Sequence, residues 1–290
     1  MYFMIHLLKL MRPHQWTKSL FVFTGLIFGH GWTDPALTQS VIIAAIAFSL
    51  LSSGIYIVND IFDLESDRKH PRKKYRPLAA GDISVALAAP WAAVLIVLAL
   101  GMGYWINAQV FIFLLAYVAL NAGYSAGLKQ IVILDVFLIA AGFMLRILVG
   151  TEGVGIPPSQ WLLLCGLMIT LFLGFTKRRA EMMVARESGV RSRKVLDQYD
   201  VALLDAFIAI TATGAIIAYG LYTMNADTIR IHGTSDLVYT LPFVIYGVMR
   251  YIFRLHRHQR GEDPARELFT DPHIIITVSA WILVVMWLIS

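Results

Sequence analysis

The sequence predicts an all-α polytopic membrane protein with nine transmembrane helices. Hydrophobic residues make up 58% of the 290 residues, charged residues make up only 15%, and the mean hydropathy is +0.68. Such a composition cannot cover a soluble globule with an ordinary polar surface. Nine apolar runs are each close to the roughly 20 residues that cross a ~30 Å hydrocarbon core. They cover residues 19–38, 39–58, 84–106, 108–128, 130–150, 159–176, 201–222, 236–255 and 272–290.

The distribution of basic residues supports the same count. If the helices alternate from a cytoplasmic N-terminus, 22 of the 24 Lys and Arg residues fall on one side, as the positive-inside rule requires. Of the other two, Arg146 lies inside a helix and Arg230 lies on the far side. Eight or ten helices would scatter the basic residues over both sides. We therefore expect the N-terminus in the cytoplasm and the C-terminus outside.

The N-terminal region contains two boundaries. The first two runs are separated at residues 31–35 by Gly, Asp and Pro, which are turn-forming residues. Residues 1–11 are apolar but too short to span a bilayer, and we interpret them as an interfacial helix. Lys18 lies at the entrance of the first transmembrane helix, where its ammonium can reach lipid headgroups or a phosphate.

The long charged loops suggest how the helices are organised. The run at 39–58 opens into a charged segment at about 60–84, and the run at 159–176 opens into another at about 177–200. This repeat suggests two four-helix halves plus a ninth helix around a central cavity open to the cytoplasm, within a single domain, 1–290. Long, charge-dense loops are typical of functional caps rather than linkers.

A polar cluster closes the second predicted helix. Asn59, Asp60, Asp63 and Asp67 fall within an arc of roughly 100° on one helical face, whereas Glu65 points elsewhere. Carboxylates this close repel one another, and their oxygen atoms are the ligands that Mg²⁺ prefers. The sequence therefore predicts a magnesium site here. A solvated acidic helix end followed by membrane-surface basic residues is the alternative.

Further charged and polar residues indicate where substrate could bind. Six Lys or Arg residues lie within residues 68–76, beside the acidic cluster, and Tyr124 and Lys129 are expected on the same side of the membrane. Asp135 and Arg146 lie at membrane depth, where ionisable residues usually mark function. At ~1.5 Å per residue they are about 16 Å apart along their helix, so each needs another partner.

The acidic pattern at the cytoplasmic end of the second helix resembles that of the UbiA-type intramembrane prenyltransferases. The resemblance covers essentially the whole chain. In that superfamily a second acidic motif after the sixth helix supplies more Mg²⁺ ligands for an isoprenoid diphosphate. This sequence departs there, because Glu181 occupies the first acidic position, Ala185 follows four residues later, and the surroundings are basic.

The departure is similar to one branch, the decaprenyl-phosphate phosphoribosyltransferases. The similar segments are residues 12–18, residues 135–146 and residues 177–181, with Gly189, Arg193 and Lys194 downstream. Those enzymes join phosphoribosyl pyrophosphate to a polyprenyl phosphate and release diphosphate, as a step toward lipid-linked arabinose. Three anionic groups require many cationic contacts, and the two charged loops hold thirteen Lys and Arg residues. The branch implies a bacterial plasma membrane location.

The resemblance implies a set of roles. Mg²⁺ would be held by Asn59, Asp63 and Asp67, and the catalytic residues would be Asp60, Asp63 and Asp67. The implied substrates are phosphoribosyl pyrophosphate and a polyprenyl phosphate, whose anionic phosphate needs no strong general base. The candidate substrate-binding residues are Lys18, Lys74, Arg76, Tyr124, Lys129, Asp135, Lys177, Arg178 and Glu181.

Other functions remain as alternatives. An aromatic or quinone prenyltransferase would use an isoprenoid diphosphate, and the lost second acidic motif argues against it. A transporter could use Asp135 and Arg146 at the midplane, but the Gly/Pro-interrupted helix pairs typical of transporters are not evident. The net charge of +5 is attributed to cytoplasmic loops that meet anionic lipid or substrate, not to nucleic acid binding. A homo-oligomer is compatible with the sequence, which does not determine the oligomeric state.

Overall fold

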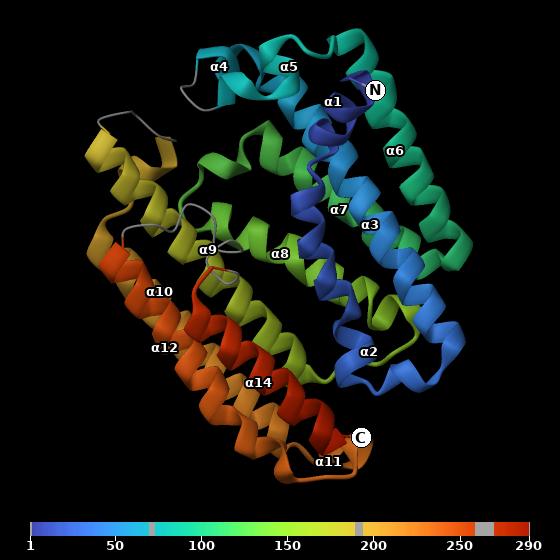
Figure 1. The fold of residues 1–290 in the computed structure, drawn as a ribbon, viewed down its shortest axis with the longest axis vertical. Helices are drawn as coiled ribbons and strands as arrows, with labels where there is room; N and C mark the ends of the chain where they lie inside the picture. The colour runs from blue at the N-terminus through green and yellow to red at the C-terminus, as the bar shows by residue number, and fades with distance from the viewer. Residues whose placement is uncertain (1, 70–72, 189–193, 259–269, 290) are drawn as a thin grey trace. The chain divides into compact units, whose positions relative to one another are not determined.

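The computed structural model describes residues 2–69, 73–188, 194–258 and 270–289, and within them the chain is helical with no strand (Figure 1). This confirms the all-α prediction. Over these residues, eight helical segments are long and apolar enough to cross a membrane. They are Pro35–Phe62, Val85–Ile106, Ala108–Ala126, Leu134–Val154, Gln160–Arg186, Val201–Met224, Asp236–Arg257 and Pro272–Ile289. The predicted count of nine is not reached, because the first apolar run does not form one long helix.

The N-terminal region is divided into short helices. After α1 (Tyr2–Met11) comes a 3₁₀ helix, η1 (Pro13–Phe23), then α2 (Thr24–Phe28) and η2 (Gly31–Thr33). A 3₁₀ helix rises ~2.0 Å per residue, so η1 and α2 together extend roughly 30 Å, which matches the hydrocarbon core. A ninth crossing by this segment therefore stays a prediction. The expected boundary is confirmed, since the next helix begins at Pro35.

Close backbone contacts hold this segment in place. A Cβ added to Gly150 would lie 1.6 Å from the Val22 carbonyl oxygen, and one added to Gly25 would lie 2.0 Å from the Gly150 carbonyl oxygen. Side-chain hydroxyls add a link to α3 (Pro35–Phe62), because Ser49 Oγ donates to Ser19 Oγ at 2.9 Å. The segment thus packs against its neighbours through backbone rather than through a continuous face of large side chains.

The chain forms two compact units, of which the first contains residues 1–125 and 145–158. In this unit α6 runs alongside α3, as Figure 1 shows, and the two approach closely where Ile96 of α6 packs against Gly54 of α3. Short helices occupy the loop expected at 60–84. The remaining elements are α4 (Leu64–Lys69), η3 (Lys73–Tyr75), α5 (Pro77–Ala80), α6 (Val85–Ile106), α7 (Ala108–Ala126) and η5 (Glu152–Val154).

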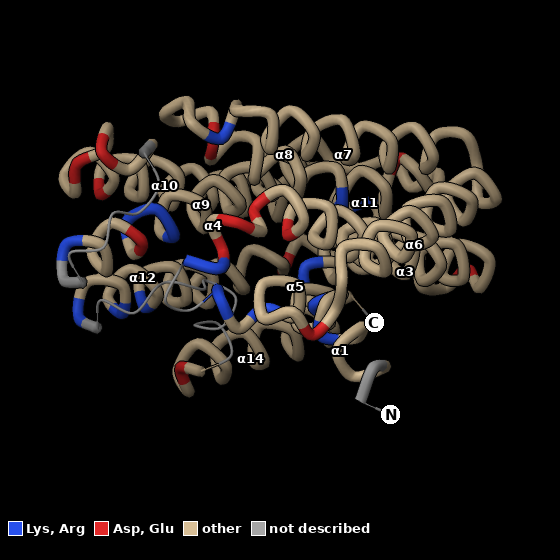
Figure 2. Tube along the Cα trace, turned by 90° about the horizontal axis from the view of Figure 1, so that it is seen from above, with Lys and Arg blue, Asp and Glu red and all other residues tan. Residues whose placement is uncertain are grey.

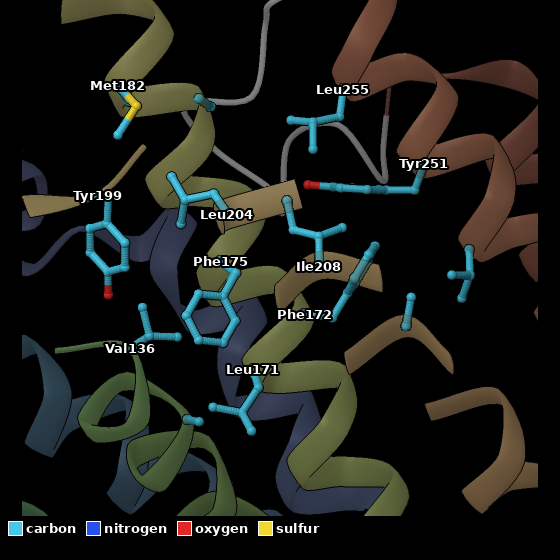
Figure 3. Close-up of a cluster of buried hydrophobic side chains, with 14 of the residues drawn as sticks. Val136, Leu171, Phe172, Phe175, Met182, Tyr199, Leu204, Ile208, Tyr251 and Leu255 are labelled. Atoms are coloured by element: carbon cyan, nitrogen blue, oxygen red, sulfur yellow. The ribbon is translucent and has the colours of Figure 1, made fainter. Parts of the chain in front are cut away.

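The second unit contains residues 126–144 and 159–290. Its core is a cluster of large apolar side chains that includes Phe172, Phe175 and Ile208 (Figure 3). The division between units falls within α8, which contributes to both. The elements are η4 (Leu128–Gln130), α8 (Leu134–Val149), α9 (Gln160–Ser188), η6 (Lys194–Gln198), α10 (Val201–Met224), α11 (Ala226–His232), η7 (Asp236–Thr240), α12 (Leu241–His258) and α14 (Pro272–Ile289).

Helix α9 corrects the expected boundary of the second charged loop. The sequence placed the helix end near residue 176, but α9 has 29 residues and continues through Ser188. At ~1.5 Å per residue it is longer than the ~30 Å core, so its charged end can extend beyond the bilayer without unwinding. Lys177, Arg178 and Glu181 therefore lie on a helix, at spacings fixed by helical geometry, rather than in a loop.

An ion pair fixes the start of the last helix. Asp271 accepts a hydrogen bond from the backbone N–H of Ile274 at 3.0 Å, and its carboxylate also contacts Arg250 at 2.9 Å and Arg254 at 3.2 Å. The hydrogen bond from Arg250 lowers the pKa of Asp271 to about 2. The carboxylate is therefore ionised at neutral pH and caps the N-terminus of α14, where negative charge is favourable.

Candidate active site

The predicted acidic cluster lies where α3 ends in the first unit. Asn59 and Asp60 are in the last turns of α3, Asp63 is the residue at which the helix ends, and Asp67 follows in α4. Asp60 is 4% exposed and Asp67 is 1% exposed. In Figure 2 the long helices are mostly uncharged along their length, and acidic residues gather around α4. Such buried carboxylates are costly unless they are paired.

Basic residues of the same unit pair with these carboxylates. Arg76 Nη1 contacts Asp60 Oδ1 at 3.0 Å and Asp67 Oδ2 at 2.6 Å, so one guanidinium bridges both acids. Arg12 Nη2 donates to Asp60 Oδ1 at 2.5 Å, and Lys73 Nζ lies 3.8 Å from Asp67 Oδ1. The chain itself therefore offsets the repulsion expected among these carboxylates, which does not by itself require a metal ion.

The same side chains offer oxygen atoms of the kind that Mg²⁺ prefers. Asn59 Oδ1 accepts a hydrogen bond from Ser125 Oγ at 2.9 Å. Asp67 Oδ1 is buried and accepts no hydrogen bond from the described residues. Over the same ranges, no three His, Cys, Asp or Glu side chains are grouped so that they could hold a metal ion. The donor chemistry therefore fits Mg²⁺, while guanidinium groups take the place of a cation in this arrangement.

Three other predicted residues lie in the first unit. Lys18 is partly buried in η1, and Tyr124 is partly buried in α7. Lys74 is exposed, and its Nζ lies 5.2 Å from the centre of the Tyr75 ring. Of the predicted phosphate contacts in this unit, Arg76 pairs with two of the carboxylates.

The second unit contains a separate buried network. Arg178 Nε lies 2.6 Å from Asp135 Oδ2, and Arg178 Nη1 donates to Glu181 Oε2 one helical turn later. Tyr199 donates its hydroxyl to Asp135 Oδ1 at 2.9 Å. The side chains of Arg178 and Asp135 are 0% exposed and that of Glu181 is 20% exposed. Four side chains from α8, α9 and the segment after η6 thus form one connected chain.

Three other predicted residues of this unit are only partly buried. Lys177 and Lys129 are partly buried, in α9 and η4 respectively, and Glu181 is partly exposed. Complete burial of Arg178 favours a supporting role for its guanidinium, through Asp135 and Glu181, over the direct phosphate contact suggested by the sequence. Among the predicted residues here, Lys177 and Glu181 are better placed to meet a substrate.

Arg146 also has partners of its own. Its Nη2 donates to the Tyr117 hydroxyl at 3.0 Å, and its guanidinium carbon lies 4.6 Å from the centre of the Phe48 ring and 4.9 Å from that of Tyr117. Contact with aromatic faces stabilises a desolvated cation. The prediction that Asp135 and Arg146 each need another partner is confirmed.

Sequence reasoning missed three residues of these networks. Arg12 was noted only as part of a similar segment, and Ser125 and Tyr199 were not considered. Tyr199 is 64 residues from Asp135 along the chain, so no local spacing could have paired them. Burial, with a contribution from Asp135, raises the pKa of the Tyr199 hydroxyl. It therefore remains protonated and acts as a hydrogen-bond donor at neutral pH.

The UbiA prenyltransferase family model matches residues 19–271, which is most of the chain. The chain belongs to the UbiA prenyltransferase family. Its similar relatives include a protein from Mycolicibacterium smegmatis that is 33% identical over 95% of this chain and 90% of the relative, and one from Corynebacterium glutamicum that is 32% identical over 95% and 84%. Both are named decaprenyl-phosphate phosphoribosyltransferase.

Solved UbiA structures share the fold. A UbiA homolog from Archaeoglobus fulgidus bound to GPP and Mg²⁺ superposes with a TM-score of 0.72 at 19% identity, over 98% of this chain and 96% of that one. A structure described for digeranylgeranylglyceryl phosphate synthase gives a TM-score of 0.67 at 19% identity, over 100% and 96%. At this identity the likeness establishes the UbiA fold for the present chain, and no more.

Proposed function

We propose that this UbiA-family protein transfers the 5-phosphoribosyl group of phosphoribosyl pyrophosphate to a polyprenyl phosphate, such as decaprenyl phosphate, and releases diphosphate. Support comes from relatives named for this activity, which match the chain almost end to end. The observation that carries the proposal at the site is the ion pair between Arg178 and Glu181. This pair favours a donor with hydroxyl groups over an isoprenoid diphosphate.

The pair changes what Glu181 can do. A single carboxylate that is paired with a guanidinium, with Ala185 where a second acidic residue would stand, offers few ligands to a metal ion, and it remains a good acceptor for hydroxyl groups. Phosphoribosyl pyrophosphate has ribose hydroxyls for such an acceptor, whereas an isoprenoid diphosphate has none. Lys177, one turn before Glu181, would contact a phosphate of the donor. The second charged segment thus suits a sugar phosphate better than a second magnesium site.

The acidic cluster of the first unit would bind a diphosphate through a metal ion. Asn59, Asp63 and Asp67 would hold Mg²⁺, which would offset the charge that develops on the leaving diphosphate. Arg76, already oriented by two buried carboxylates, would contact a phosphate, with Lys18, Lys74 and Tyr124 as further candidates in this unit. Lys129 is a candidate in the second unit. Asp60 would orient the guanidinium groups of Arg12 and Arg76.

The chemistry requires positioning more than acid–base catalysis. An oxygen of the lipid phosphate, anionic at neutral pH, forms a bond to C1 of the ribose, and the bond from C1 to the diphosphate oxygen breaks with inversion. The diphosphate leaves with the electron pair, and no proton needs to be removed from the nucleophile. The residues of the site would therefore act by holding the two phosphates in line.

Lys177→Ala is expected to raise the KM for phosphoribosyl pyrophosphate by one to two orders of magnitude. A charge-assisted contact contributes roughly 1.5–3 kcal/mol, and about 1.4 kcal/mol corresponds to a factor of ten. The KM for the lipid should change much less. The measurement is donor saturation at fixed polyprenyl phosphate with the purified protein and labelled donor.

Arg186→Ala is the matched control, because Arg186 is exposed on the same helix. It should leave both KM values near those of the wild type. An unchanged donor KM in Lys177→Ala would contradict the role of Lys177. Transfer of a prenyl group to an aromatic acid by the wild type, without need of phosphoribosyl pyrophosphate, would overturn the function itself.

We also propose that the N-terminus is cytoplasmic and the C-terminus lies outside the bacterial plasma membrane. The support is the placement of 22 of 24 basic residues on one side and an N-terminal segment, η1 with α2, long enough for a ninth crossing. A reporter fused after Ser290 should be active outside the cytoplasm. A cytoplasmic signal from that fusion would contradict the nine-crossing arrangement.

A further inference from the structure

The hydroxyl of Tyr199 joins two parts of the turn that leads into α8. It accepts a hydrogen bond from the backbone N–H of Ile133 at 2.7 Å and donates one to Asp135 Oδ1 at 2.9 Å. The ring is 5% exposed and belongs to the core cluster, with its hydroxyl end toward Val136 (Figure 3). Both hydrogen bonds are therefore made by a side chain that packing holds in place.

The turn that it contacts has an unfavourable backbone conformation. Ile133 has a φ of 70°, in the left-handed region, which a β-branched residue rarely adopts. Such conformations persist only when the surroundings determine them. The hydrogen bond from the Ile133 N–H to Tyr199 is one such determinant, and two residues later the chain places Asp135 in the first turn of α8.

Asp135 transmits this geometry to α9. One carboxylate oxygen of Asp135 receives the Tyr199 hydroxyl, and the other faces Arg178 Nε at 2.6 Å. Arg178 in turn donates to Glu181, whose side chain is 20% exposed at the margin of this buried network. The chain thus consists of two hydrogen bonds joined by an ion pair, and a fully satisfied buried network of this kind makes its members rigid.

We propose that Tyr199 is a positioning residue for donor binding, because its hydroxyl sets Asp135, and through Asp135 and Arg178 it orients Glu181 toward the ribose of the donor. The proposal rests on the proposed function, in which Glu181 contacts the donor. Tyr199 itself touches Asp135 and Ile133, not the substrate. Its removal should therefore weaken donor binding while leaving the lipid site and the chemical step largely intact.

Tyr199→Phe tests this, because it deletes the hydroxyl and keeps the ring in the core. The KM for phosphoribosyl pyrophosphate should rise roughly tenfold, which corresponds to about 1.4 kcal/mol. The KM for polyprenyl phosphate and the kcat at saturating substrate should both stay within about twofold of the wild-type values. Equal rises in both KM values would indicate a general structural defect and would overturn the proposal.

Tyr219→Phe is the matched control in the same unit. The Tyr219 hydroxyl also makes two buried hydrogen bonds, to Thr240 Oγ1 at 2.6 Å and from Trp281 Nε1 at 2.9 Å, but it does not reach Asp135. Thermal unfolding should show that both variants lose stability to a similar extent. Only Tyr199→Phe should change the donor KM. A comparable rise in Tyr219→Phe would overturn the proposal.

A double-mutant cycle tests the route through Glu181. In a Glu181→Gln background, Tyr199→Phe should raise the donor KM by less than about twofold, since coupled residues are not additive. A full tenfold rise in that background would overturn the route. If the wild type transfers phosphoribosyl groups and Tyr199→Phe matches it, only the inference fails. If the wild type shows no such transfer, the proposed function fails and the inference fails with it.

Discussion

Asp67→Asn is expected to lower turnover by about 10²–10³-fold, a loss typical of removing one group that stabilises charge in a transition state. The variant keeps the shape and one carbonyl oxygen, but it removes the charge that would help to hold Mg²⁺. Chelation of divalent cations should abolish turnover, and Asp63→Ala should do the same without unfolding the protein. The measurement is phosphoribosyl transfer as a function of Mg²⁺ concentration.

Two comparisons separate metal binding from ion pairing, because Asp67 also contacts Arg76 at 2.6 Å. Arg76→Lys should raise the donor KM without raising the Mg²⁺ concentration needed for half-maximal rate, whereas Asp67→Asn should raise that concentration. Glu65→Gln is the matched control in α4, since Glu65 pairs only with Arg68 at the exposed surface among described residues. Full activity in excess chelator would exclude the magnesium site.

Asp135→Ala is expected to lower the free energy of unfolding by about 3 kcal/mol, because it removes the buried one of the two carboxylates that pair with the Arg178 guanidinium. Both side chains are 0% exposed, so water cannot replace the lost carboxylate. Donor affinity should fall as well, since Arg178 would no longer be held in place. The measurement is reversible unfolding in detergent, together with donor saturation.

The double variant Asp135→Ala/Arg178→Met separates these two effects. Removing both charges should restore most of the stability, because apolar side chains often replace a buried ion pair at little cost. Donor affinity should remain low. Asp227→Ala is the control, since Asp227 pairs with Arg230 and both side chains are largely exposed, and its loss should cost only about 1 kcal/mol. A similar loss in Asp227→Ala would argue against burial as the cause.

Helix α9 shows that hydropathy does not locate the end of a helix. The apolar run ends near residue 176, and a helix end was expected there, yet α9 continues for about three more turns through charged residues. Hydropathy reports where a segment meets water, whereas a helix ends where backbone hydrogen bonding ends. The same distinction explains the N-terminal segment, whose apolar run at 19–38 is interrupted where η1 changes to α2 at Thr24 and where α2 ends before His30, a residue with a φ of 55°.

The sequence by itself determined the all-helical membrane fold and the approximate positions of the long helices. These depend on composition and on the 3.6-residue period, which act within one element. Only the tertiary structure decided which charges pair. Arg12 pairs with Asp60, 48 residues away along the chain, and Tyr199 pairs with Asp135, 64 residues away. Such partners are set by how the helices pack. Burial makes each unpaired charge costly, wherever its partner lies in the sequence.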